Sequence, residues 1–198
     1  NDIAVKNQDK SIDGKFRYDV SLIDYDLIIE HHGTYYHSFG SNSVNPISKM
    51  TEESKNIHMI KADNCESNNV TLFQIFSNEW KDKRQNLIWK SMILNHIKKS
   101  NIIINAKDCE IKEIAVNIYE DFINNNYLPK YISSEIMYGL YFNNELIQAI
   151  GIKKHNSVHY ITAICSKVNH LIIDGEFTIL NHIENNYNIE ELRAICNR

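Results

Sequence analysis

The chain has 198 residues, 43% of them hydrophobic and 23% charged, which is typical of a soluble globular protein with one large or two small domains. Its net charge of −4 excludes a protein whose whole surface is basic, and no apolar run reaches the roughly 18 residues of a membrane-spanning helix. The first 20 residues are too polar for a secretory signal peptide, so we expect a cytoplasmic protein with no membrane partner.

The cysteines also indicate a cytoplasmic protein. The chain has four, and they lie far apart at Cys65, Cys109, Cys165 and Cys196. None forms a C-x-x-C pair, which excludes a zinc ribbon or a dithiol redox motif. We expect reduced, mostly buried thiols. The chain does not begin with Met, which indicates a fragment or a processed protein.

The first ordered feature that the sequence predicts is a β-hairpin with acidic residues at one end. Asp19 opens a strand over Val20–Leu22, and a polar turn at Asp24–Asp26 reverses the chain. A second strand, Leu27–His32, contains Glu30. Two adjacent antiparallel strands joined by a short turn would bring the carboxylates of Asp19 and Glu30 together at one end of a sheet.

Three histidines accompany these carboxylates. Side chains alternate along a strand, so His32 shares a face with Glu30, while His31 faces away and receives no catalytic role. His37 follows a few residues later. Two carboxylates and two histidines around a metal-sized space would suit hydrolysis of a phosphodiester, because Mg²⁺ usually takes carboxylate oxygens and water. The alternative is an ordinary polar strand terminus.

The next segments predict a helix, a buried strand and a second helix. Residues 38–54 are rich in Ser and Asn and predict a loop. Glu52–Ser67 predicts a helix, and the apolar run Val70–Phe76 predicts a buried strand. Lys81–Lys99 has the apolar spacing of an amphipathic helix, with Leu87 on the apolar face. Glu79, just before it, is a candidate helix cap.

Residues 15–97 carry a resemblance to a nuclease family. The motifs are Asp19, then Glu30-His31-His32-Gly33, then Tyr35-Tyr36-His37, followed by a helix with Lys61 and Cys65 and the pair Glu79-Trp80. In order and spacing they resemble the very-short-patch-repair-type nucleases, a branch of the PD-(D/E)XK restriction-endonuclease-like fold, and especially their phage and homing-endonuclease relatives.

The resemblance implies a phage-encoded homing or repair endonuclease acting on double-stranded DNA in a bacterial or phage-infected cell. It implies Asp19 and Glu30 as ligands of Mg²⁺, with Mn²⁺ as a substitute. His32 stands where the family commonly has Lys or another polar group, and would orient or deprotonate the attacking water. His37 would donate to the phosphate or protonate the leaving oxygen. Many such nucleases dimerise, so a homodimer or larger complex stays open.

A locally basic stretch follows the predicted buried strand. Lys81–Lys112 contains eight Lys or Arg against three acids. Such a stretch would suit contacts with DNA phosphates, and the alternative is a solvated helix face. The candidate DNA-binding residues are Arg17, Lys61, Lys81, Lys83, Arg84 and Lys90.

The second half of the chain predicts a separate α+β unit. It begins with a short strand at Ile102–Ile104, and residues 107–114 lead into a helix to about Asn125 with Ile114 and Ile118 on its apolar face. Three strands (137–141, 146–152 and 158–164), a helix (172–183) and a last strand (192–196) follow. Asn143-Asn144 is a hairpin turn signal between the first two of these strands.

This half resembles the GNAT acyltransferase fold, and more closely the Mom-type DNA-modifying phage domains. The motifs are AKDCEIKEI (106–114), GLYFNNELIQAIG (139–151) and ICSKVNHLIIDGEFTIL (164–180). The usual Arg before Cys165 is missing, and Asp174-Gly175-Glu176 puts acids where a pyrophosphate would lie. We therefore expect a degenerate structural or DNA-positioning unit without coenzyme A, truncated before the last strands of such a fold.

Together these features predict an α/β (α+β) protein, with a restriction-endonuclease-like mixed sheet flanked by helices over residues 1–100 and a small GNAT-like accessory domain over residues 101–198. The predicted function is a metal-dependent DNA endonuclease. Only 18 residues precede Asp19, too few for the additional upstream Glu of related nucleases. Two alternatives stay open: a catalytically degenerate DNA- or protein-binding protein of the same fold, and an acyltransferase-like modifying domain.

Overall fold

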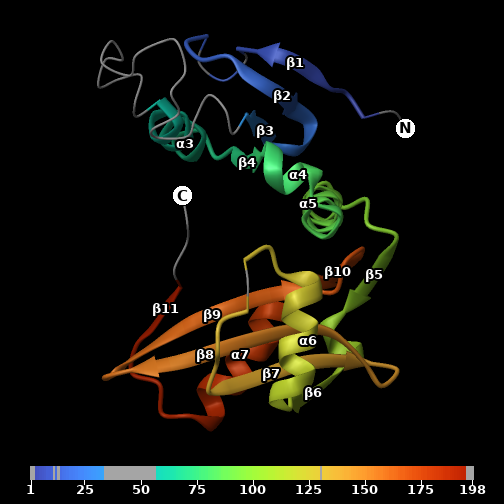
Figure 1. The fold of residues 1–198 in the computed structure, drawn as a ribbon, viewed down its shortest axis with the longest axis vertical. Coiled ribbons are helices and arrows are strands. Elements are labelled where there is room, and N and C mark those ends of the chain that lie inside the picture. Colours follow the sequence, from blue (N-terminus) through green and yellow to red (C-terminus); the bar gives the residue numbers. More distant parts are fainter. Residues whose placement is uncertain (1–2, 11, 13, 34–56, 130, 195–198) are drawn as a thin grey trace. The chain divides into compact units, whose positions relative to one another are not determined.

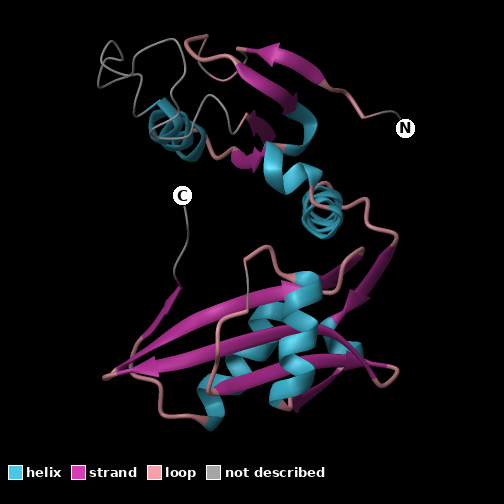
Figure 2. Cartoon of the chain, viewed as in Figure 1, coloured by secondary structure: helices cyan, strands magenta, loops and turns pink. Residues whose placement is uncertain are grey.

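The structure, a computed structural model, describes residues 3–10, 12, 14–33, 57–129 and 131–194 (Figure 1). Over this part the chain is mixed α+β, with three sheets and both α- and 3-10 helices (Figure 2). It divides into two compact units between Asn86 and Leu87. The sequence analysis placed this boundary after residue 100, whereas the division falls inside helix α5 (Lys83–His96).

Unit 1 contains a four-stranded mixed sheet in the order β1-β2-β3-β4. Neighbours β1/β2 and β2/β3 are antiparallel, whereas β3 and β4 are parallel, which requires a crossover segment between them. The strands are β1 (Lys6–Asp9), β2 (Tyr18–Leu22), β3 (Leu27–His32) and β4 (Thr71–Phe76).

The predicted hairpin is confirmed in β2 and β3. Val20 pairs with Ile29 and Leu22 with Leu27, around a 3-10 turn at Ile23–Tyr25. Asp26 closes this turn in the left-handed region, with φ 48°, a conformation that Asp tolerates better than most residues.

Side chains alternate along the end of β3 as the sequence predicts. Ile28, Glu30 and His32 are buried on one face, and His31 between the last two is exposed. Helix α3 (Ile57–Ser67) lies in the crossover between β3 and β4. The predicted first residues of this helix, 52–56, lie outside the described part of the chain.

The apolar contact between α3 and the sheet is small. It consists of Tyr18, Ile28 and Cys65, with Val70 and Leu72 at its margin. An α/β layer needs such a contact to hold helix and sheet together. Because the apolar contact ends at Ile28, the polar residues farther along β3 meet α3 through hydrogen bonds and charge.

The single helix predicted over Lys81–Lys99 is two helices. Asp82 has an extended backbone (ψ 125°) and separates α4 (Ser77–Lys81) from α5. Its carboxylate then accepts a hydrogen bond from Gln85 N at 2.8 Å, which caps the start of α5. The predicted apolar face was wrong at Leu87, which is exposed.

Unit 2 contains a five-stranded sheet in the order β11-β9-β8-β7-β6, and β5 pairs with β10 in a separate parallel two-stranded sheet. In the larger sheet only β11 and β9 are parallel. The strands are β5 (Ile102–Asn105), β6 (Glu110–Glu113), β7 (Ile136–Phe142), β8 (Glu145–His155), β9 (Val158–Ser166), β10 (His170–Ile173) and β11 (Leu192–Ala194).

The Asn143-Asn144 turn is confirmed between β7 and β8. Both asparagines have positive φ (50° and 64°), as a tight hairpin turn requires. On the other side of β8 the register shifts, because Gly151 pairs with Ala163 and Ile152 with Ile161. Thr162 is therefore the extra residue of a β-bulge in β9.

Two helices cover opposite faces of this sheet. Helix α6 (Val116–Asn126) packs with Ala149 of β8, and α7 (Gly175–Asn186) packs with the next residue, Ile150, whose side chain points the other way. Strand β6 lies in the segment predicted to lead into α6, and α7 begins at Gly175 because β10 extends to Ile173. Ile118, placed on the apolar face of α6, is exposed.

Candidate functional site

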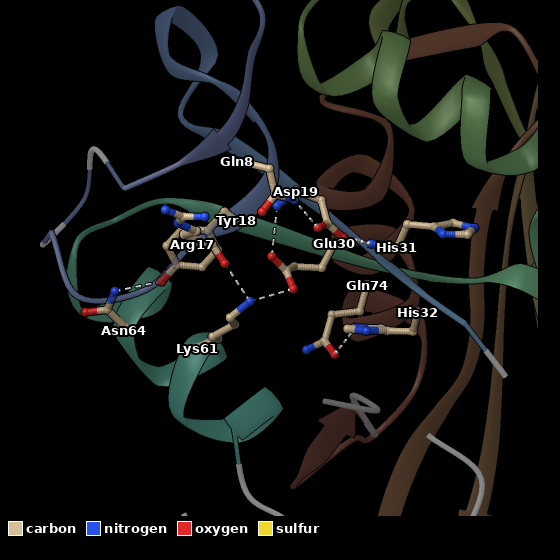
Figure 3. A network of polar contacts seen from close by, with 10 residues as sticks. All are labelled: Gln8, Arg17, Tyr18, Asp19, Glu30, His31, His32, Lys61, Asn64 and Gln74. Carbon is tan, nitrogen blue, oxygen red and sulfur yellow. Dashed lines mark hydrogen bonds and ion pairs between the residues drawn. The ribbon is translucent and has the colours of Figure 1, made fainter. Parts of the chain in front are cut away.

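Asp19 and Glu30 meet at the end of the hairpin, as the sequence predicts (Figure 3). Glu30 is only 5% exposed, and its Oε1 accepts a hydrogen bond from Asp19 N at 3.1 Å. Asp19 Oδ2 accepts from His31 N at 2.9 Å, and Oδ1 accepts from Gln8 Nε2 at 3.0 Å. Each strand thus fixes the carboxylate of the other through a backbone N–H.

Lys61 brings a positive charge to this pair from α3. Its Nζ lies 2.8 Å from Glu30 Oε2 and donates to Arg17 O at 2.7 Å. The lysine side chain is 15% exposed, and its ammonium lies 5.3 Å from the centre of the Tyr18 ring. The sequence analysis listed Lys61 as a surface contact for DNA, whereas the structure places it inside the carboxylate cluster.

His32 lies on the same face of β3 and is 3% exposed. Its Nε2 is 3.1 Å from Gln74 Oε1, and its ring lies edge-on to His58 with 4.4 Å between ring centres. Figure 3 shows His31 pointing away from this group. His32 is therefore enclosed by protein groups, and Gln74 fixes the orientation of its ring.

Gln74 is the site residue that the sequence analysis missed. It stands beside Glu30 because β3 and β4 pair in parallel, with Glu30 opposite Gln74 and His32 opposite Phe76. A polar residue in the middle of the apolar run Val70–Phe76 was the available signal, since a glutamine in a strand covered by a helix needs a polar partner.

The charges of the cluster do not balance. Two carboxylates, Asp19 and Glu30, face the single ammonium of Lys61, which leaves one negative charge among these three groups. Burying a carboxylate as deeply as Glu30 costs free energy unless a charge partner and hydrogen bonds compensate. The arrangement attracts a further cation to the open side, at Asp19, which is half-buried.

The donor set fits a magnesium ion. In the described part of the chain each oxygen of Asp19 and Glu30 accepts one hydrogen bond, which leaves a lone pair on each. Mg²⁺ is commonly held by one or two carboxylates plus water and substrate oxygens. Among the described residues no group of three or more His, Cys, Asp or Glu is arranged around a metal-sized space. His37 lies outside the described residues.

The remaining basic candidates are placed as follows. Arg17, Lys81 and Lys83 are exposed and belong to unit 1, whereas Lys90 is exposed and belongs to unit 2. Arg84 is half-buried. Glu79 caps α4 and not the helix predicted over Lys81–Lys99. Glu79 Oε2 accepts a hydrogen bond from Phe76 N at 3.2 Å, at the start of α4.

Unit 2 has a cavity of about 260 Å³ between α5, the end of α6, the end of β9 and the first turn of α7. Burial raises the pKa of the Cys165 thiol in its wall to about 12, so this thiol stays protonated near neutral pH. Glu176 places a carboxylate in the wall. At the start of α7, the Gln148 side chain lies so close to Gly175 that a Cβ there would overlap it.

Comparisons of the chain with protein-family models, with curated proteins and with solved structures found no match. No helix in the described part of the chain is both long and apolar enough to cross a membrane. The geometry of the carboxylate cluster and the motifs in the sequence are therefore the basis for a proposed function.

Proposed function

We propose that unit 1 is a metal-dependent DNA endonuclease, with its active site formed by Asp19, Glu30 and Lys61. The observation that carries the proposal is the buried Glu30 carboxylate, held between Asp19 N and the Lys61 ammonium beside a second carboxylate. Removing two carboxylates and an ammonium from water does little for stability, so such clusters more often serve ligand binding or catalysis.

Asp19 and Glu30 would hold Mg²⁺, or Mn²⁺ in its place. When bound, the ion supplies Lewis-acid polarisation of the phosphate and neutralises charge on the reacting oxygens. The backbone N–H groups of Asp19 and His31 hold the carboxylates in orientation by hydrogen bonds of 3.1 and 2.9 Å. This preorganisation would let both side chains bind the metal ion without a rearrangement of the hairpin.

Lys61 is the group we assign to the phosphate. The PD-(D/E)XK nucleases that the chain resembles commonly have Lys or another polar group at the position of His32, and here α3 supplies a lysine ammonium to the Glu30 carboxylate. A lysine ammonium has three donors, and Lys61 uses two of them, on Glu30 and on Arg17 O. The third can donate to a phosphate oxygen.

His32 and Gln74 act as positioning residues in this proposal. His32 is 3% exposed and bonded to Gln74, so it supports the sheet end from inside. This role differs from the one that the resemblance implies, in which His32 would orient or deprotonate the water. A water-directed role for His32 through Nε2 would need Gln74 to give up its hydrogen bond.

The experiment is a supercoiled-plasmid cleavage assay with Mg²⁺ or Mn²⁺, comparing the wild-type chain with Asp19→Asn and Glu30→Gln. We expect metal-dependent nicking that falls by about 100- to 1000-fold in both variants, because each removes a charge that orders the reacting groups. Asp24→Asn is the matched control, since Asp24 is an exposed acid in the same hairpin. Titration calorimetry with Mg²⁺ gives a second readout that does not depend on cleavage.

One outcome would contradict the proposal. If the folded protein neither binds Mg²⁺ nor nicks DNA, the Lys61–Glu30 pair is structural, and a catalytically degenerate binding protein is favoured. Binding of a coenzyme A thioester would favour the acyltransferase-like alternative for unit 2. We expect no such binding, because the GNAT resemblance implies that the acids of Asp174-Gly175-Glu176 would face the pyrophosphate.

A further inference from the structure

The chain that follows β4 exposes aromatic rings and lysines together. We call residues Phe76–Lys83 the aromatic–basic segment. Phe76 is 41% exposed and Trp80 38% exposed, so each ring keeps a substantial part of its surface in solvent. Lys81 and Lys83 are exposed as well.

This segment begins at the edge of the sheet that carries the carboxylates. Phe76 pairs with His32 across β3 and β4, and the two rings are 5.3 Å apart. Ser77 Oγ donates to His32 O at 3.1 Å and lies 3.5 Å from His31 Nε2. Helix α4 therefore starts where β3 ends, two residues beyond Glu30 (Figure 1).

The segment contains two acids and two lysines, so it carries no net charge. Its two acids bond to backbone N–H groups: Glu79 Oε2 accepts from Phe76 N, and Asp82 Oδ1 accepts from Gln85 N. These bonds turn both carboxylates toward the starts of α4 and α5, where helix dipoles favour negative charge. Lys81 and Lys83 reach the solvent on the same short stretch.

We propose that the aromatic–basic segment binds an unpaired stretch of a DNA strand next to the active site. Bases would stack on Trp80 and Phe76, and Lys81 and Lys83 would contact the phosphates. The proposal rests on the proposed function, which makes the substrate a DNA strand, and it deepens it by naming unpaired DNA as the part that is held.

The chemistry of the segment favours unpaired over paired DNA. Inside a duplex the faces of the bases are covered by their neighbours, so exposed rings gain nothing from them without unstacking. A stacked base contributes about 1–3 kcal/mol to binding a single strand. Two lysines give fewer phosphate contacts than duplex-binding surfaces usually make, and the chain as a whole has a net charge of −4.

Tryptophan fluorescence can test this directly, because the chain has only two tryptophans. Trp80 is 38% exposed, whereas Trp89 in α5 is 8% exposed. The probe is an oligothymidylate of about 12 nucleotides, titrated in EDTA so that no strand is cut. We expect the fluorescence to be quenched, and Trp80→Phe to remove the quenching while keeping the affinity within a few fold.

Further variants separate stacking from charge. Trp80→Ala should weaken binding of the oligothymidylate by about tenfold. Lys81→Gln with Lys83→Gln should lower the slope of log affinity against log salt by about 1.4, or about 0.7 per lysine. The matched controls are Phe177→Ala, an exposed aromatic of unit 2, and the exposed pair Lys107→Gln with Lys154→Gln. Both controls should leave the binding unchanged.

Three results would overturn the inference. The first is equal or tighter binding of a duplex of the same length, and the second is a Trp80→Ala variant that binds the oligothymidylate as well as wild type does. The third is a control variant that weakens binding as much as the variants of the aromatic–basic segment do. Tighter binding of an RNA strand would overturn the assignment to DNA. The titration contains no metal, so it measures binding independently of cleavage. If the oligothymidylate quenches the fluorescence of a protein that cuts no DNA, the single-strand binding is supported and the proposed endonuclease activity is contradicted.

Discussion

Both units bury polar side chains, but of different kinds. In unit 1 the buried groups at the sheet end are charged, with Glu30 against Lys61. In unit 2 the buried polar side chains include Gln148 and His159, and a group of neutral hydroxyls lies beside the bulge. Ser134 Oγ lies 2.6 Å from Thr162 Oγ1 and donates to Tyr119 Oη at 3.2 Å. Hydroxyls that bond to one another fill the space beside a bulge at little cost, whereas buried charges are expensive. This contrast is why the proposed active site is placed in unit 1.

Lys61→Met should give the largest combined effect. It leaves the buried Glu30 carboxylate without its charge partner, so we expect a loss of about 3 kcal/mol in the free energy of unfolding. Plasmid cleavage should fall by about 100-fold. Urea unfolding followed by fluorescence measures the first effect, and the nicking assay measures the second.

The double variant Glu30→Gln with Lys61→Met sharpens this test. Both charges are then gone, so most of the lost stability should return while cleavage stays absent. If Lys61→Met alone leaves stability unchanged, the ion pair contributes nothing to the fold. The contrast between charged and neutral clusters would then fail.

Gly151→Ala should destabilise unit 2 by about 2 kcal/mol without touching the cluster in unit 1. A Cβ at this position would overlap the Tyr119 hydroxyl and Ser134 Oγ, so these side chains would have to shift. Tyr119→Phe with Gly151→Ala should recover part of the loss, because the overlapping hydroxyl is removed. Loss of DNA nicking in a folded Gly151→Ala protein would contradict the division of roles.

The smallest effect is expected at Cys165. Burial raises its pKa to about 12 from an ordinary value of 9.0, so the folded protein keeps the proton longer than the unfolded chain does. The resulting contribution to stability is fully present below pH 9 and is lost as the pH rises from 9 toward 12. Cys165→Ala should therefore make unfolding less dependent on pH in that range.

Alkylation with iodoacetamide checks the same thiol chemically. At pH 8 Cys165 should react far more slowly in the folded protein than in urea, as mapped by mass spectrometry. Rapid modification of Cys165 in the folded protein would show a reactive thiol. It would also point to thiol chemistry in the cavity of unit 2.

Local features of the sequence determined the hairpin of unit 1 and the turn of unit 2. The alternation of Glu30, His31 and His32 follows from the period of two along a strand, and positive φ at Asn143 and Asn144 follows from the turn they form. These predictions hold because each depends on residues close together in the chain.

Tertiary structure decided what surrounds the carboxylates. Lys61 reaches Glu30 because α3 lies in the crossover between β3 and β4. Gln74 stands opposite Glu30 because β4 pairs with β3 in parallel, in a register that no spacing in the sequence reveals. Helix ends were also misplaced, since Asp82 has an extended backbone between α4 and α5 and β6 takes the residues assigned to the start of α6. The physical reason is that strand register and helix packing depend on contacts between distant residues, and these override local propensity.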